Sequence, residues 1–208
     1  MKNSSLSTLL LLFLLGLTRA LAGVPDDPTQ VRPIEPGSEA PAFIAKEVDG
    51  ATFRFDPAHL KHPVLLIFYR GGWCPYCNAH LHDLRLVEPK ILALGYRVLF
   101  LSTDRPEILY SSLKEKVNYH LLSDSNLDAA RAFGIAYRLD DATFAKMKSF
   151  GVDLEATQGN GLRQLPVPSV FIVDHTGIVR FRYCNPDFRV RLDAASILAE
   201  ARRATEPL

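Results

Sequence analysis

The 208-residue sequence predicts an α/β fold in which a mixed central sheet is flanked by helices. Apolar runs of strand length alternate with stretches whose apolar residues recur every three or four positions, as expected for strands between helices. The last two predicted strands, at residues 169–174 and 177–183, are joined by only two residues and must be antiparallel. The length suits one domain, and the net charge of +1 comes without any basic block that would indicate nucleic acid.

The N-terminal residues predict an export signal. Lys2 is followed by an apolar run at residues 9–17, too short to span a bilayer comfortably, and then by "ALA" at residues 20–22, with small residues where a signal peptidase prefers them. We predict cleavage after Ala22, which removes two basic residues and no acid and leaves a net charge of −1. The mature protein would be periplasmic or secreted, with no stable membrane span. An uncleaved membrane anchor is the alternative.

Residues 23–40 are rich in proline and are predicted to form an extended arm. The folded domain is expected to cover residues 41–205. Its first element is a hairpin within residues 42–55, turning at Asp49 and Gly50, a pair that favours tight turns.

The other elements follow from the spacing of apolar residues. The predicted strands lie at residues 63–69, 96–102, 119–124, 169–174 and 177–183. The predicted helices lie at residues 75–94, with a kink at Pro89, at 104–117, 126–133, near 143–150, and at 193–203. Asp104 and Glu107 have the spacing of a capping box, and Gly134 can end the helix that precedes it.

Two of the three cysteines, Cys74 and Cys77, lie at the junction between a buried strand and a helix. Pro75 suits the first helical position, which makes Cys74 the N-cap. There its sulfur faces free backbone N–H groups and the positive end of the helix dipole, and both lower a thiol pKa. Cys77, one turn further on, is positioned to attack a mixed disulfide on Cys74. We predict a redox pair rather than a structural staple, because so small a loop removes little chain entropy.

The same helix permits a metal-binding interpretation. It contains a C-x-x-C-x-x-H-x-H pattern, formed by Cys74, Cys77, His80 and His82. Two histidines two residues apart on a helix do not converge easily, and His82 points away from the apolar stripe. We therefore predict no metal or other cofactor and expect both histidines at the surface. A copper-handling module remains an alternative.

Longer motifs resemble the thioredoxin superfamily. "FYRGGWCPYC", "VLFLSTD", "SDSNLDAARAFGIAY" and "PVPSVFIVDHTGIVRF", in this order, resemble the peroxiredoxin-like branch of the alkyl hydroperoxide reductase/thiol-specific antioxidant (AhpC/TSA) family, over about residues 36–203. The resemblance implies a thioredoxin-like fold with an N-terminal hairpin and an extra strand and helix near residues 119–134. It also implies a cis peptide bond before Pro168, beside the cysteines.

Together these observations predict an antioxidant thiol–disulfide oxidoreductase. Cys74 would be the nucleophile, Cys77 the resolving cysteine, and Pro168 the backbone that pairs with substrate. The substrate-facing candidates are Arg70, Trp73, Tyr76 and Val167. The expected partners are protein or small-molecule thiols and disulfides, together with an unidentified electron donor.

The chain also departs from true peroxiredoxins, whose Pro-x-x-x-Thr/Ser-x-x-Cys motif and downstream arginine hold the peroxide. The matching positions here are Ile67, Gly71 and Pro168. Arg70 could replace the positive charge, but nothing replaces the hydroxyl, so we expect weak peroxide activation. A thiol-dependent peroxidase with Cys74 as the peroxidatic cysteine, acting on peroxide, is the alternative.

For four further residues the sequence gives only weak indications of a role. Cys184 is expected to pack as a small apolar side chain, with a second resolving thiol or an intermolecular disulfide as alternatives. Glu47 is a candidate for moving protons to Cys77. Arg189 and Arg191, in "NPDFRVR", are expected to be exposed polar residues without a role.

Overall fold

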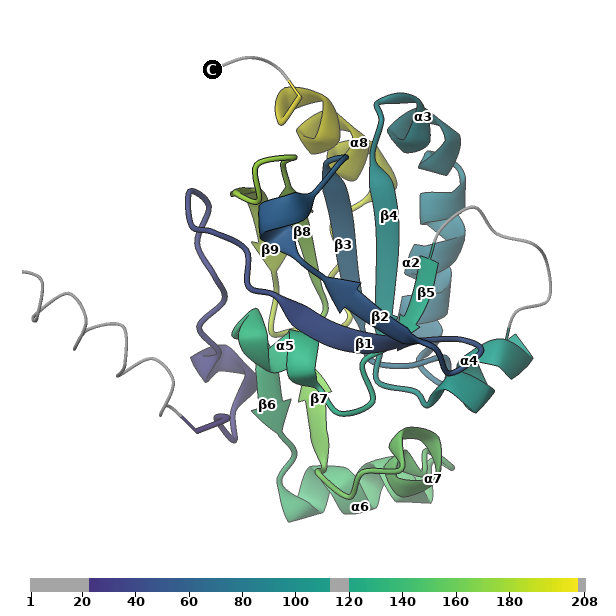
Figure 1. The fold of residues 1–208 in the computed structure, drawn as a ribbon. Coiled ribbons are helices and arrows are strands. Elements are labelled where there is room, and N and C mark those ends of the chain that lie inside the picture. The colour runs from purple at the N-terminus through teal and green to yellow at the C-terminus, as the bar shows by residue number, and fades with distance from the viewer. Residues whose placement is uncertain (1–22, 113–119, 206–208) are drawn as a thin grey trace, which may run out of the picture.

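The computed structural model describes residues 23–112 and 120–205 (Figure 1). Its centre is a seven-stranded mixed sheet with the order β2-β1-β5-β4-β3-β8-β9. The strands are β1 (Phe43–Glu47), β2 (Thr52–Phe55), β3 (Val64–Tyr69), β4 (Arg97–Ser102), β5 (His120–Ser123), β8 (Ser169–Val173) and β9 (Val179–Cys184). Every predicted strand is confirmed, as are the antiparallel pairs β1–β2 and β8–β9.

Helices and a small second sheet complete the fold. The helices are η2 (Pro28–Gln30), η3 (Pro57–His59), α2 (Pro75–Arg85), α3 (Glu88–Ala93), α4 (Pro106–Ser112), α5 (Asp128–Ala132), α6 (Asp141–Ser149), α7 (Leu154–Gln158) and α8 (Ala194–Arg203). The antiparallel pair β6 (Ala136–Arg138) and β7 (Gln164–Pro166) was not predicted, and it lies with α6 and α7 at one end of the main sheet (Figure 1).

Strand β3 divides the core into two halves. Its residues Leu65, Ile67 and Tyr69 belong to an apolar cluster with residues of α2, α3 and α8. The alternate residues Val64, Leu66 and Phe68 pack instead in a cluster with α5 and the β1–β2 hairpin. Figure 1 shows α5 and α2 on opposite sides of the sheet. Burial on both faces explains why the strand is a continuous apolar run.

The single kinked helix predicted for residues 75–94 is wrong, because two helices replace it. Helix α2 ends at Arg85, where the Leu86 N–H donates to the Asp83 carbonyl oxygen. Pro89 then lies in the first turn of α3. Proline removes a hydrogen bond inside a helix but none in its first turn, so a break with a restart is less costly than a kink.

The capping box predicted at Asp104 and Glu107 is also wrong. Asp104 is 1% exposed, and its Oδ2 accepts hydrogen bonds from the Gly72 N–H at 2.6 Å and the Ser102 hydroxyl at 3.1 Å. The carboxylate therefore faces the loop before Cys74 rather than the start of α4. The predicted end of this helix lies outside the described residues.

The proline-rich segment 23–40 is packed on the domain along part of its length. Ile34 and Ala40 are buried, and their N–H groups donate to the carbonyl oxygens of Phe133 at 3.2 Å and Gly177 at 2.8 Å. The predicted signal at residues 1–22 lies outside the described residues. Within the described ranges, no helix has the length and apolar composition needed to cross a membrane.

Candidate active site

Cys74 is the N-cap residue of α2, and Pro75 begins the helix, as predicted. The Cys74 carbonyl oxygen accepts hydrogen bonds from the backbone N–H groups of Cys77 and Asn78, both at 3.0 Å. Both cysteines are free thiols in this structure. The local geometry thus places one sulfur at the start of the helix and the other one turn into it.

The two thiols have opposite ionisation preferences. The Cys77 thiol donates a hydrogen bond to the Cys74 sulfur, and this is the largest of the effects that together lower the pKa of Cys74 to about 6. The positive charges of Arg70 and Arg191 act in the same direction, while burial opposes them. The same hydrogen bond, followed by burial, raises the pKa of Cys77. Near neutral pH, Cys74 is therefore the thiolate and Cys77 the thiol.

Both sulfurs are enclosed. Cys74 is 1% exposed and Cys77 is fully buried, so burial does not distinguish the two cysteines. They belong to the apolar cluster on the α2 face of the sheet, against which Trp73 and Leu192 also pack. A substrate sulfur must displace part of this cover to reach Cys74.

Arg70 brings a buried positive charge to the site. The residue is 6% exposed, and its guanidinium carbon lies 4.1 Å from the ring centre of Phe188 and 4.9 Å from that of Trp73. Its Nη2 lies 3.8 Å from the Met147 sulfur. Within the described part of the chain, Arg70 Nε has no hydrogen-bond acceptor. The thiolate of Cys74 is thus a natural counter-charge for this guanidinium.

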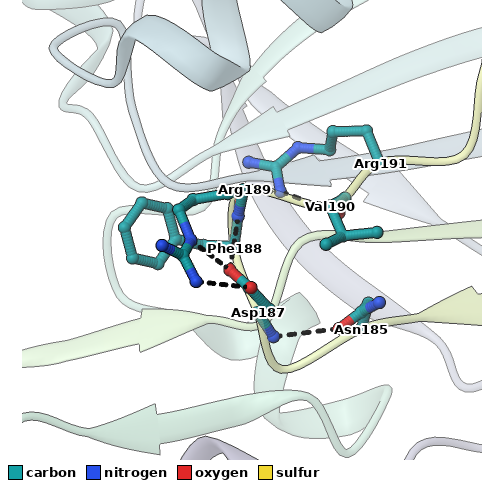
Figure 2. A network of polar contacts seen from close by, with 6 residues as sticks. All are labelled: Asn185, Asp187, Phe188, Arg189, Val190 and Arg191. Atoms are coloured by element: carbon teal, nitrogen blue, oxygen red, sulfur yellow. Dashed lines mark hydrogen bonds and ion pairs between the residues drawn. The ribbon is translucent and has the colours of Figure 1, made fainter.

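Residues 185–191, between β9 and α8, place two arginines differently (Figure 2). Arg189 pairs with Asp187 through contacts of 2.9 and 2.8 Å, and its side chain is 62% exposed, as predicted. Arg191 donates from Nη1 to the Phe188 carbonyl oxygen and from Nη2 to Cys77 Sγ, the latter at 3.4 Å. Arg191 is half-buried and contacts Cys77, so the prediction that it is an exposed residue is wrong.

His80 is buried rather than at the surface, which corrects a second prediction. Its Nε2 lies 2.9 Å from the carbonyl oxygen of Leu192, the residue after Arg191. Burial lowers the pKa of His80, so the neutral ring donates this hydrogen bond. His82 is exposed, as predicted. Within the described ranges, no group of three or more His, Cys, Asp or Glu side chains is placed to hold a metal ion.

The pattern of the AhpC/TSA family matches residues 36–182. The chain belongs to the AhpC/TSA family. It is therefore a thiol-dependent redox enzyme, and the resemblance seen in its motifs is confirmed.

Individual relatives of this AhpC/TSA protein carry two kinds of name. Peroxiredoxin Bcp of Escherichia coli K12 is 31% identical over 106 residues, which cover 50% of this chain and 67% of the relative. The thiol:disulfide interchange protein DsbE of Yersinia pestis is 27% identical over 179 residues, covering 85% and 78%. Peroxidoxin BcpB from Mycobacterium tuberculosis has a solved structure that matches with a TM-score of 0.62 and 19% identity, covering 83% of this chain and 99% of the other. The thioredoxin-like fold is confirmed by this likeness.

This AhpC/TSA protein has no room for a hydroxyl at the position where peroxiredoxins carry Thr or Ser. Gly71 has φ +148°, and a Cβ atom there would lie 2.3 Å from Trp73 Nε1 and 2.9 Å from Asp104 Oδ1. Threonine at this position would force Trp73 to move. The conformation and packing of this loop therefore exclude the threonine or serine side chain that would supply the hydroxyl.

The expectation of a cis peptide bond before Pro168 is wrong, since no peptide bond is cis in residues 23–112 or 120–205. The Val167 N–H donates to the Ile135 carbonyl oxygen at 2.8 Å, and its side chain is fully buried beside Tyr137 and Leu165. The Val167 side chain is therefore enclosed in the core, and Pro168 is buried as well.

The other candidates divide between the site and its surroundings. Tyr76 is 45% exposed, with its ring centre 5.8 Å from that of Phe188, and Trp73 is half-buried, so both can meet a partner. Glu47 is remote, because strands β5 and β4 separate β1 from β3. Cys184 is partly buried, and burial raises its pKa.

Proposed function

We propose that this enzyme is a thiol–disulfide oxidoreductase whose redox couple is Cys74–Cys77. One observation carries the proposal: the two thiols share a hydrogen bond at the start of α2 and differ in pKa in the direction that exchange requires. The Cys74 thiolate would attack a substrate disulfide, forming a mixed disulfide and releasing one substrate thiolate. Cys77 would then lose its proton and attack Cys74 Sγ, releasing the second substrate thiolate and leaving the protein oxidised.

Further features support this role. Arg70 and Arg191 favour the Cys74 thiolate, and the exposed ring of Tyr76 offers a substrate a contact beside it. The Yersinia pestis relative is named as a thiol:disulfide interchange protein. The expected partners are protein or small-molecule thiols and disulfides. The loop at Gly71, which excludes a hydroxyl, favours exchange over peroxide activation.

The test is reduction of insulin or a small disulfide in the presence of dithiothreitol. We expect Cys74→Ser to abolish activity, Cys77→Ser to accumulate a mixed disulfide on Cys74, and Cys184→Ser to remain active. Cys184 lies on β9 and is partly exposed, and its replacement serves as the matched control. Activity that survives Cys74→Ser would refute the proposal.

A thiol-dependent peroxidase is the second candidate, and it is favoured by the low pKa of Cys74 and by the name of the Escherichia coli relative. The Cys74 thiolate would attack a peroxide to form a sulfenic acid and release water or an alcohol. The Cys77 thiol would then condense with the sulfenic acid, forming the disulfide and releasing water. Stoichiometric hydrogen peroxide should then remove the Cys74 and Cys77 thiol titre within seconds. Persistence of both thiols would exclude this candidate.

We also propose that residues 1–22 are an export signal cleaved after Ala22, leaving the arm at 23–40 and the domain at 41–205. The apolar run at residues 9–17 and the small residues after it support this proposal. Sequencing the N-terminus of protein recovered from the periplasm or medium tests it. A mature chain that begins at Gly23 is expected, and a full-length chain in the membrane would indicate the anchor instead.

A further inference from the structure

We propose that Arg191 is a catalytic residue that stabilises the negative charge arriving on Cys77 Sγ when a substrate thiolate opens the Cys74–Cys77 disulfide. The inference rests on the proposed exchange function and deepens it. The contact that carries it is the 3.4 Å distance between Arg191 Nη2 and Cys77 Sγ. This guanidinium touches one of the two sulfur atoms that change partners.

The opened disulfide needs such a group, because Cys77 is fully buried. Burial penalises a charged sulfur, and it raises the pKa of this thiol. The same penalty opposes the departure of Cys77 as a thiolate. Of the groups that act on Cys77, the ones that favour its charged form are the backbone of Arg70 and the charge of Arg191. Arg191 is therefore the side chain that can offset the cost.

Arg191 is available for this task because its neighbour takes the nearby acid. The side chain of Arg189 holds the carboxylate of Asp187 through two contacts (Figure 2). Among the described residues, Arg191 donates instead to the backbone carbonyl oxygens of Phe188 and Val190 and to Cys77 Sγ. Within the described residues, Arg191 Nε is buried without an acceptor. The charge of Arg191 is thus available to the Cys77 sulfur, although it also contributes to the lowered pKa of Asp187.

Reduction of the Cys74–Cys77 disulfide needs no further reagent when the substrate is a dithiol. Its first thiolate attacks Cys74 Sγ, a substrate–Cys74 bond forms, and the Cys74–Cys77 bond breaks with its electron pair on Cys77 Sγ beside Arg191. The second substrate thiol passes its proton to Cys77 and attacks the substrate sulfur of the mixed disulfide, which releases Cys74 as a thiolate. The substrate becomes a disulfide, the protein gains two electrons, and the proton of the first thiol goes to solvent.

The experiment follows reduction of the oxidised protein by dithiothreitol through the fluorescence of Trp73, the single tryptophan in the chain. We expect Arg191→Gln to lower the second-order rate constant by about tenfold or more, since a charge-assisted hydrogen bond to the departing sulfur is lost. Arg191→Lys should recover part of the rate. Arg203→Gln, at an exposed position of α8 where the arginine pairs with Glu200, should react like the wild type. An Arg191→Gln protein that opens as fast as the wild type overturns the inference.

A second reaction separates Cys77 from Cys74. In a Cys77→Ser protein, Cys74 is loaded with 2-nitro-5-thiobenzoate, and the attacking thiol then expels the dye instead of Cys77. Adding Arg191→Gln to this protein should leave the rate of dye release nearly unchanged. An equal loss in both reactions would place the effect on Cys74 or on folding and would overturn the inference. Exchange activity that survives Cys74→Ser would instead refute the proposed function itself.

Discussion

The carboxylate of Asp104 accepts a hydrogen bond from the backbone N–H of Gly72 at 2.6 Å. This contact ties the end of β4 to the loop that leads into Cys74, and the Ser102 hydroxyl supports it from the same strand at 3.1 Å. One residue earlier, the Thr103 hydroxyl donates to the Arg70 carbonyl oxygen at 2.7 Å. Two consecutive side chains of one segment thus hold the loop that positions the nucleophile.

Replacing Asp104 with Ala should lower the free energy of unfolding by about 1–3 kcal/mol, because a buried charge-assisted hydrogen bond is lost. Urea denaturation followed by Trp73 fluorescence measures this change. Glu107→Ala is the matched control, because Glu107 is exposed and would matter only if the capping box existed. Equal losses in the two variants would restore the capping box and contradict the assignment of Asp104 to the Gly72 loop.

The low pKa of Cys74 should depend on its neighbour. In a Cys184→Ser background, we expect the ultraviolet absorbance of the Cys74 thiolate to titrate with a midpoint of about 6. Cys77→Ala removes the thiol that donates to Cys74, so the midpoint should move upward, toward the ordinary cysteine value of about 8.5. A midpoint that does not move would show that the hydrogen bond between the thiols does not set the acidity of Cys74.

Gly71→Ala should destabilise the protein by about 1–3 kcal/mol, because the backbone is in a conformation that side chains disfavour and the new Cβ meets Trp73. The fluorescence of Trp73 should change in the folded protein as its ring moves. Gly72→Ala is the control, since a Cβ atom there would meet only Asp104 Oδ2, at the ordinary distance of 3.6 Å. Similar stability of the two variants would contradict the close packing of Gly71.

The parts of this site that were predictable from the sequence are local in the chain. Cys74 as N-cap follows from a strand, a proline and a helix within a few residues, and β3 follows from its own burial on both faces. Arg191, in contrast, meets Cys77 across 114 residues, and His80 meets Leu192 across 112. No periodicity indicates such contacts, because they depend on how α8 and its preceding loop return to α2.

The same limit explains two errors. Asp104 has the spacing of a helix cap, but Gly72, which is 32 residues earlier, competes for its carboxylate and wins. The strands β6 and β7 are three residues long and lie far apart in the sequence, so neither shows a clear alternation. Val167, which follows β7 directly, is buried in a cluster with Tyr137 and Leu165. Contacts of this kind become visible only in the folded chain.

Asp124 should make the stability of the protein depend on pH. Burial raises its pKa to about 7, although the N–H groups of Ala129 and Ala130 donate to its oxygens. The folded state therefore holds this proton more tightly than the unfolded chain, so stability should fall as pH rises from about 4 toward 7. Denaturation at several pH values should show a flatter profile for Asp124→Asn. Asp153→Asn, at the exposed cap of α7, should keep the wild-type slope, and an unchanged slope in Asp124→Asn would contradict the prediction.

His80 should act as a positioning residue for Arg191. Its ring, on α2, donates a hydrogen bond of 2.9 Å to the carbonyl oxygen of Leu192, the residue that follows Arg191. His80→Phe keeps the ring volume and loses the donor, so dithiothreitol should open the Cys74–Cys77 disulfide more slowly than in the wild type. His80→Gln can donate again and should recover part of the rate. His82→Phe, on the exposed side of the same helix, should have no effect. If His80→Phe lowers stability but leaves the opening rate intact, the hydrogen bond supports packing and does not place Arg191 on Cys77.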